Sequence, residues 1–187
     1  MSSASRQNGN ARENLGSLEF DTMLEIVVIP VSDVDRATRF YRELGWRLDI
    51  DFKSGDDYRV IQFTSPGSGC SIMFGRNITT AASGSAQGLS LIVTDIEMAR
   101  NELLRRGISI SEPFHDTGRV FHHADGKGIE SGANPQRQSY ASYASFSDPD
   151  GNGGVAQEST TRLSGWSETW RSPVYASGSP CDSRNVT

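Results

Sequence analysis

The sequence predicts an α+β protein built from two tandem βαβββ modules. The first observation is a repeat, because residues 31–37 (VSDVDRA) return 62 positions later as residues 93–99 (VTDIEMA). The same offset relates the apolar run 26–29 to residues 88–91, and the pair Leu44-Gly45 to Arg106-Gly107. A chain of 187 residues suits one domain or two small fused modules.

Composition excludes several classes of function. The chain has 35% hydrophobic residues and a formal net charge of -5, so it has no basic field to attract nucleic acid. Residues 1–17 do not resemble a signal peptide, and no apolar run is long enough to span a bilayer. We therefore expect a cytoplasmic protein with no nucleic-acid or membrane partner. Cys70 and Cys181 lack metal-type spacing and look incidental.

The first module is expected over residues 22–78, after a polar tail (1–21) predicted to be disordered. Residues 24–31 form a nearly continuous apolar run, typical of a strand covered on both faces, and Pro30 indicates an edge position or the end of that strand. Asp33 is placed to cap the following helix, and Gly45 to end it. Three further strands are predicted at 46–52, 58–64 and 70–75.

The second module is expected over residues 88–163, after a Ser/Ala/Gly linker. It repeats the pattern with a strand at 88–93, a helix from Asp95 to Gly107 and a strand at 108–114. Residues 63–66 (FTSP) match 146–149 (FSDP) at an offset of 83, so this module has 21 more residues (83 minus 62), placed at 115–139. A loop of this length is typical of a lid or a disordered insertion. Strands at 140–146 and 155–158 complete it, and 164–187 is an irregular tail.

These motifs resemble the vicinal oxygen chelate superfamily, which includes glyoxalase I, bleomycin-resistance proteins and extradiol dioxygenases. The resemblance covers residues 23–163 and includes VSDVDRA with Phe40-Tyr41 and Leu44-Gly45, VTDIE, FSDPDGNG and Gln157-Glu158. It implies that the two sheets lie side by side as a half-open barrel, usually in a homodimer. It also implies a divalent metal held inside by the first and last strands of each module.

The positions that correspond to those metal ligands are Ile26, Gly75, Gly88 and Glu158. Only Glu158 has a ligating side chain, whereas catalytic metal sites usually use about three protein ligands. We therefore expect no cofactor, and a divalent metal is disfavoured.

Strand alternation then predicts the wall of the cavity. If Glu158 points inward, Gly154 and Ala156 accompany it, together with Ser71 and Met73 in the first module. The first strands contribute Ile26, Val28, Gly88, Ser90 and Ile92. A small, apolar wall with one polar group is typical of a small-molecule site. Glu158 is then the candidate general acid or base, unless it reaches solvent or pairs with an arginine such as Arg59.

The inserted loop adds further candidates. His115, His122 and His123 lie in it or at its start, and could supply metal ligands or proton transfer if the loop covers the cavity. Tyr140 follows the loop, on a strand whose inward face the pattern does not decide. Residues 148–153 (DPDGNG) superficially match a calcium loop, but the bidentate Glu is missing, so a β-turn is favoured.

Three functions remain open. The first is metal-independent binding of a small organic molecule, by sequestration or, if the protein is an enzyme, by lyase or isomerase chemistry at Glu158. The second is a metal-dependent glyoxalase-like lyase, isomerase or dioxygenase with ligands from unexpected places. The third is a dimeric scaffold without a ligand. Sequestration of an antibiotic is a variant of the first.

Overall fold

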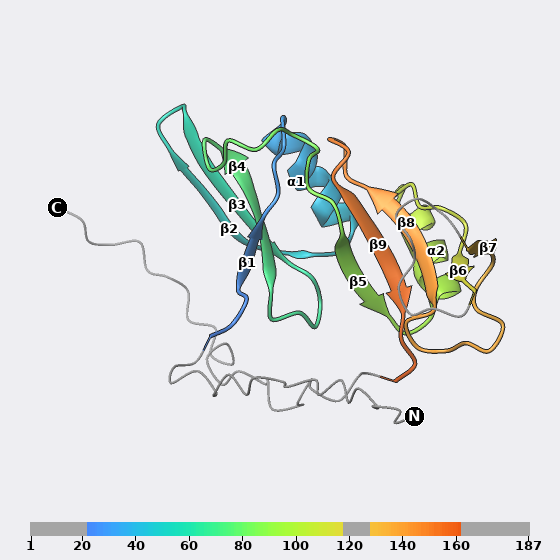
Figure 1. Ribbon diagram of the computed structural model, residues 1–187. Helices are drawn as coiled ribbons and strands as arrows, with labels where there is room; N and C mark the ends of the chain where they lie inside the picture. The colour runs from blue at the N-terminus through green and yellow to red at the C-terminus, as the bar shows by residue number, and fades with distance from the viewer. Residues whose placement is uncertain (1–21, 118–127, 162–187) are drawn as a thin grey trace, which may run out of the picture.

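The computed structural model describes residues 22–117 and 128–161, in two sheets that lie side by side and are not closed into a barrel (Figure 1). The predictions for the two tails and for His122 and His123 fall outside these residues. Sheet 1 has the strand order β1-β4-β3-β2. Its strands are β1 (Ile26–Val28), β2 (Arg47–Ser54), β3 (Tyr58–Thr64) and β4 (Ser71–Arg76). Together with α1 (Val34–Glu43), they form the predicted βαβββ module.

Sheet 2 repeats this arrangement with one extra strand, in the order β5-β9-β8-β6-β7. It contains β5 (Leu89–Val93), β6 (Phe114–Asp116), β7 (Ile129–Ser131), β8 (Ser142–Ser147) and β9 (Gly153–Glu158), with α2 (Ile96–Arg105). In both modules the first strand is parallel to the last, and the other pairs are antiparallel. The predicted α+β fold with two βαβββ modules is confirmed.

Both helices begin where the repeated aspartates predict. Asp33 accepts a hydrogen bond from Arg36 N at 3.0 Å, and Asp95 accepts one from Met98 N at 2.9 Å. Each carboxylate satisfies one of the backbone N–H groups that the first helical turn leaves unpaired. The pKa of Asp33 lies below its usual value, first because of the hydrogen bond from the Arg36 backbone.

One apolar core joins the two modules on the helix side of the sheets. It contains Tyr41 and Phe74 from module one and Ile96 and Phe146 from module two. Tyr41 lies within 5.4 Å of both Trp46 and Phe74, measured between ring centroids. Since this core is continuous, burial of apolar surface fixes the two modules against each other.

Two strand predictions need correction. The predicted strand 24–31 is reduced to the three residues of β1, and Val27 and Val28 are exposed instead of covered on both faces. Its neighbours explain this, because β1 is an edge strand and ends shortly before Pro30. Residues 108–114 are mostly irregular, with one isolated bridge between Ile110 and Phe146.

The described part of the inserted segment contains β7 and most of β6. Its described residues form the hairpin of β6 and β7, in which His115 lies opposite Glu130. Within 22–117 and 128–161, no helix is long and apolar enough to cross a membrane.

Candidate ligand-binding face

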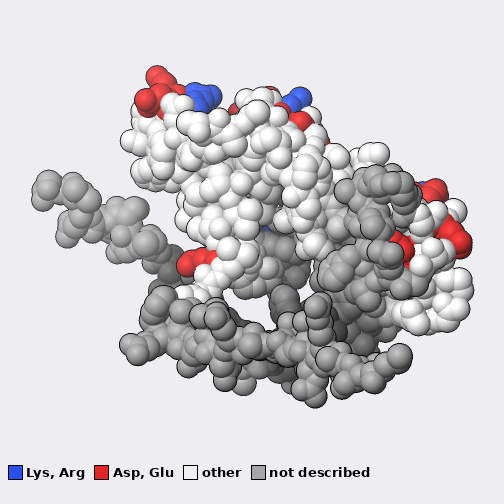
Figure 2. Space-filling model, in the orientation of Figure 1, with Lys and Arg blue, Asp and Glu red and all other residues white. Residues whose placement is uncertain are grey.

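The side of sheet 1 that faces away from α1 carries exposed apolar side chains, and we call it the open face. Ile61, Phe63, Ile72 and Phe74 point to the core, so their neighbours on β3 and β4 point the other way. Strand register extends this face to β1 and β2. The open face consists of Ile26, Val28, Ile50, Phe52, Val60, Gln62, Thr64, Ser71 and Met73. Figure 2 views the molecule with the sheets in front of the helices, and the described part of this side shows few charged side chains.

One row of the open face crosses all four strands. Val28 lies opposite Met73, Met73 opposite Gln62, and Gln62 opposite Ile50. With strands about 4.8 Å apart, the row is about 14 Å wide. Val28 and Ile50 are 42% and 41% exposed, and Phe52 in the adjoining row is 54% exposed. The row is therefore an apolar strip with a single amide at its centre.

A chain of hydrogen bonds runs beside this strip. Gln62 Nε2 donates to Ser71 Oγ at 3.2 Å, and Ser71 Oγ lies 2.7 Å from Thr64 Oγ1. Thr64 donates in turn to the carboxylate of Asp49, which sits at a β-bulge in β2. Ser71 and Thr64 are buried, so the chain satisfies polar groups that would otherwise be costly to desolvate.

The predicted inner wall of the second module is divided between two faces, because its β9 residues point the other way from Ser90 and Ile92. Leu91 pairs with Ala156 and Val93 with Glu158, so Gly154, Ala156 and Glu158 share the helix side with Leu89, Leu91 and Val93. Ser90 and Ile92 alternate with these residues and point to the other side, where both are exposed. The sequence prediction assumed that Glu158 points into the cavity, and it assigned the alternate residues of β9 to that side. The parallel pairing of β5 with β9 instead places these residues on the helix side.

Glu158 lies buried between β9 and the start of α2. Its Oε1 accepts a hydrogen bond from Ile96 N at 3.2 Å, and its Oε2 accepts one from Arg137 Nε at 3.0 Å. Arg137 Nη2 donates to Oε1 as well, which makes the ion pair bidentate. The predicted partner, Arg59, instead binds Asp35 and Asp51 on the helix side of sheet 1. This geometry gives Glu158 a structural set of partners and does not favour proton transfer in a cavity.

Four of the other predicted residues lie together on the open face, and three lie at separate places outside it. Ile26, Val28, Ser71 and Met73 lie together on the open face of sheet 1, as the alternation predicts. Tyr140 lies just before β8 with a φ of 67°, and its carbonyl oxygen accepts hydrogen bonds from Tyr143 Oη and Gln157 Nε2. His115 is buried, with Nδ1 at 2.9 Å from Gly132 O. Gly88 is exposed and ends the linker with a φ of 85°.

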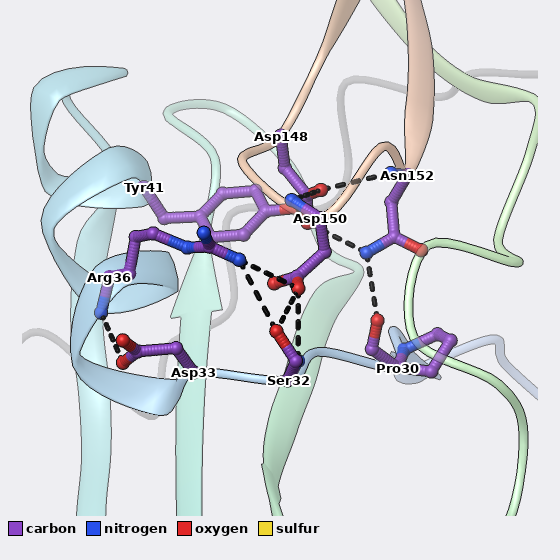
Figure 3. A network of polar contacts seen from close by, with 8 residues as sticks. All are labelled: Pro30, Ser32, Asp33, Arg36, Tyr41, Asp148, Asp150 and Asn152. Atoms are coloured by element: carbon purple, nitrogen blue, oxygen red, sulfur yellow. Dashed lines mark hydrogen bonds and ion pairs between the residues drawn. The ribbon is translucent and has the colours of Figure 1, made fainter.

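The turn between β8 and β9 fastens the two modules together, and we call this set of contacts the latch (Figure 3). Asp150 Oδ1 accepts from Ser32 N at 3.1 Å and from Arg36 Nη2 at 2.9 Å. Asn152 Nδ2 donates to Pro30 O at 2.9 Å, and Tyr41 Oη donates to Asp148 Oδ2 at 3.4 Å. The motif that superficially matches a calcium loop is thus a β-turn, closed by Gly151 N on Asp148 O.

Comparison with known proteins identifies the family. A model of the Glyoxalase/Bleomycin resistance protein/Dioxygenase superfamily matches residues 23–153. The chain belongs to this superfamily. The relationship inferred from the sequence motifs is therefore confirmed. A comparison with curated proteins finds no match.

Solved structures of the superfamily share the fold. A glyoxalase/bleomycin resistance protein from Streptomyces sp. CB03234 is 25% identical, with a TM-score of 0.52 over 73% of this chain and 100% of that chain. A superfamily member from Sphaerobacter thermophilus DSM 20745 is 25% identical, with a TM-score of 0.54 over 74% and 98% of the two chains. TnmS3, an antibiotic binding protein from Streptomyces sp. CB03234, is 24% identical, with a TM-score of 0.55 over 74% and 97%.

The metal that the glyoxalase superfamily implies does not fit the residues present. Ile26, Gly75 and Gly88 have no ligating side chain, and Glu158 is bound by Ile96 N and Arg137. A Cβ atom at Gly75 would lie 1.9 Å from Arg59 O, so β4 has no room for a side chain there. Within the described ranges, no group of three His, Cys, Asp or Glu residues is arranged to hold a metal ion.

A separate polar pocket lies at the turn between β1 and α1, with a volume of about 400 Å³. Ser32, Asp35, Arg59 and Asn77 are among its lining residues, and Gly75 is the one predicted metal position among them. Its Arg59 is already paired with Asp35 at 2.7 Å, so its positive charge is neutralised. An apolar ligand would find little apolar wall in this pocket.

Sequence reasoning missed Gln62, Thr64, Asp49 and Arg137. The alternation of β3 contains a usable signal, because Ile61 and Phe63 are apolar while Gln62 and Thr64 are polar. Asp49 is brought in by a β-bulge, and Arg137 comes from the inserted segment with a φ of 49°. Neither a bulge nor an arginine contact of this kind has a signature in a single sequence.

Proposed function

We propose that this chain binds a small, largely apolar organic molecule on the open face of sheet 1, without a metal ion. The single observation that carries the proposal is the exposure of Val28 and Ile50 on one continuous strip, with exposed Phe52 in the adjoining row. Exposed apolar patches that are bordered by polar groups mark binding surfaces, because covering them removes apolar area from water. The strip is about 14 Å wide, which matches a molecule of two or three fused rings.

Binding accounts for the residues better than metal-dependent or acid–base catalysis does. Three of the family's four metal positions lack a ligating side chain, and the fourth, Glu158, is engaged by Arg137 on the far side of β9. The open face provides apolar area for contact with a ligand and one amide that can orient it, as small-molecule sites typically do.

The proposal is tested with two aromatic probes, 2-naphthol and 2-methoxynaphthalene, by fluorescence titration of the full chain. A Phe52→Asp substitution puts a charge beside the strip and should weaken the binding of both probes about tenfold or more. Met98 is the matched control, since it is 69% exposed but lies on α2. Met98→Asp should leave both affinities unchanged. The proposal fails if neither probe binds, or if the two variants behave alike.

Sequestration of an antibiotic is the second candidate, and it is a special case of the first. It is favoured by the 25% identity to the Streptomyces protein described as a glyoxalase/bleomycin resistance protein. Expression of the chain in a sensitive bacterium should then raise the inhibitory concentration of an aromatic antibiotic, and Phe52→Asp should remove this effect. Equal protection by the wild-type chain and by the Phe52→Asp variant would exclude the open face as the binding site.

We also propose that the protein is a homodimer in which a second copy covers the open face. The two sheets of one chain are not closed, so Val28, Phe52 and, on sheet 2, Ile92 remain exposed in the single chain. A second copy of the chain would bury this area and enclose the ligand.

A further inference from the structure

The hydrogen-bond chain beside the apolar strip has a fixed direction. The carboxylate of Asp49 can only accept, and it takes the single proton of the Thr64 hydroxyl. Thr64 Oγ1 can then only accept from Ser71, which uses the single proton of the Ser71 hydroxyl. Ser71 Oγ must in turn accept from Gln62, so the amino group of the Gln62 side chain points toward Ser71. The Asp49 carboxylate therefore determines the orientation of the Gln62 amide through three successive hydrogen bonds.

Because its amino group points toward Ser71, the Gln62 side chain turns its carbonyl oxygen outward. Within the described residues, no donor lies within hydrogen-bonding distance of Gln62 Oε1, and the side chain is only half-buried. Its neighbours across the sheet are Met73 and Ile50, neither of which can donate. The open face thus presents one oriented acceptor in the middle of an apolar strip.

We infer that Gln62 selects ligands that carry a hydrogen-bond donor, such as a phenol, an alcohol or an N–H group, on an apolar ring system. This inference rests on the proposed binding of an apolar molecule to the open face and names the class of that ligand. Asp49, Thr64 and Ser71 are positioning residues, because they hold the amide in the accepting orientation. Arg47 Nε donates to Asp49 Oδ1 and fixes the start of the chain.

A donor placed over Gln62 gains a hydrogen bond, whereas an ether leaves the amide oxygen desolvated without a partner. This asymmetry is larger than the hydrogen bond alone, since an unsatisfied buried acceptor carries its full desolvation cost. The wild-type chain should therefore bind 2-naphthol about tenfold more tightly than 2-methoxynaphthalene.

Gln62→Met removes the acceptor at nearly constant volume and should bring the preference for 2-naphthol close to onefold. Ser71→Ala removes the acceptor for the Gln62 amino group, so the amide can turn and offer an N–H. The preference should then fall because 2-methoxynaphthalene binds more tightly, a change that a purely structural role of Ser71 would not produce. Gln136→Leu, in the loop before β8, is the control and should keep the wild-type preference. Thermal melts check that each variant is folded.

The possible outcomes separate this inference from the proposed function. Equal affinity of the wild-type chain for the two probes overturns the role of Gln62 while leaving ligand binding on the open face intact. A preference that survives Gln62→Met also overturns it. Failure of both probes to bind overturns the proposed function, and the inference with it.

Discussion

The carboxylate of Glu158, in the last strand of module two, caps the backbone N–H of Ile96 at the start of α2. A negative charge at this position is favoured by the partial positive charge of the helix N-terminus. Arg137 completes the site with a bidentate ion pair and approaches Asp95 Oδ1 at 3.7 Å. The inserted segment, β9 and α2 are thus joined by one buried charge.

Loss of Arg137 should strongly destabilise the protein. Arg137→Ala leaves the fully buried Glu158 carboxylate without its cation, and the expected cost is about 3 kcal/mol in the free energy of unfolding. Urea denaturation measures it. Arg105→Ala is the control, because Arg105 pairs with Glu102 on an exposed helix face and its loss should be close to neutral. Equal losses in the two variants would contradict this assignment.

The latch should depend on Asn152 more than on any exposed residue of the same turn. Asn152 is buried and bonds Pro30 O, Asp148 Oδ2 and Ala86 N. Asn152→Ala leaves these groups unsatisfied, so we expect a loss of about 2–3 kcal/mol in thermal or urea unfolding. Pro149→Ala, in the exposed part of the turn, serves as the comparison. A neutral Asn152→Ala variant would show that the apolar core alone fixes the modules.

Stability should decline at alkaline pH partly because of Tyr41. Burial, and next the charge of Asp148, raise the pKa of Tyr41 far above its usual value near 10. Above pH 10 the unfolded chain loses this proton while the folded chain keeps it, so stability falls as the pH rises. Between pH 9 and 11 the loss from this group is about 1.4 kcal/mol. Urea denaturation of Tyr41→Phe should show a correspondingly flatter decline, and a parallel decline in both proteins would refute this.

Gly75 should tolerate no side chain. An alanine Cβ at this position would lie 1.9 Å from the backbone oxygen of Arg59, so β3 and β4 would have to separate. Gly75→Ala should lower the free energy of unfolding by about 3 kcal/mol or more. Gly69 is a fair control because a Cβ there meets nothing within 4 Å. Gly69→Ala should be close to neutral, and similar melting temperatures for the two variants would contradict the close approach.

The oligomeric state tests the proposed dimer directly. Sedimentation of the full chain at micromolar concentration should give twice the chain mass of 20.4 kDa. Phe52→Asp should shift the equilibrium toward the single chain, because a carboxylate would be buried in the contact. Met98→Asp should leave it unchanged. A monomer at all concentrations would show that the open face is not covered by a second copy.

The repeated motifs predicted the fold because each combines local signals that tertiary structure rarely overrides. Asp33 and Asp95 are N-caps with a direct physical role, and Gly45 and Gly107 follow the helices with φ values of 80° and 81°. The length of β1 could not be predicted. Its apolar residues indicate a buried strand, but they are exposed on an edge, where a ligand or another chain can cover them.

The facing of Glu158 shows where single-sequence reasoning stops. Alternation gives two faces for β9, but only its pairing with β5 decides which face meets the helix. Glycine and alanine at 154 and 156 fit a cavity wall and a tight core equally well. In the structure the ring of Phe146 packs over Gly154, which explains the small residues by core packing.

The contact of Gly75 with the Arg59 carbonyl also limits how this protein can change. A coordinating side chain cannot be introduced at that strand by one substitution, since β3 would first have to shift. Even if a histidine were introduced at another of the metal positions, Glu158 would still be paired with Arg137. Evolution from this chain toward a metalloenzyme would therefore begin with the backbone.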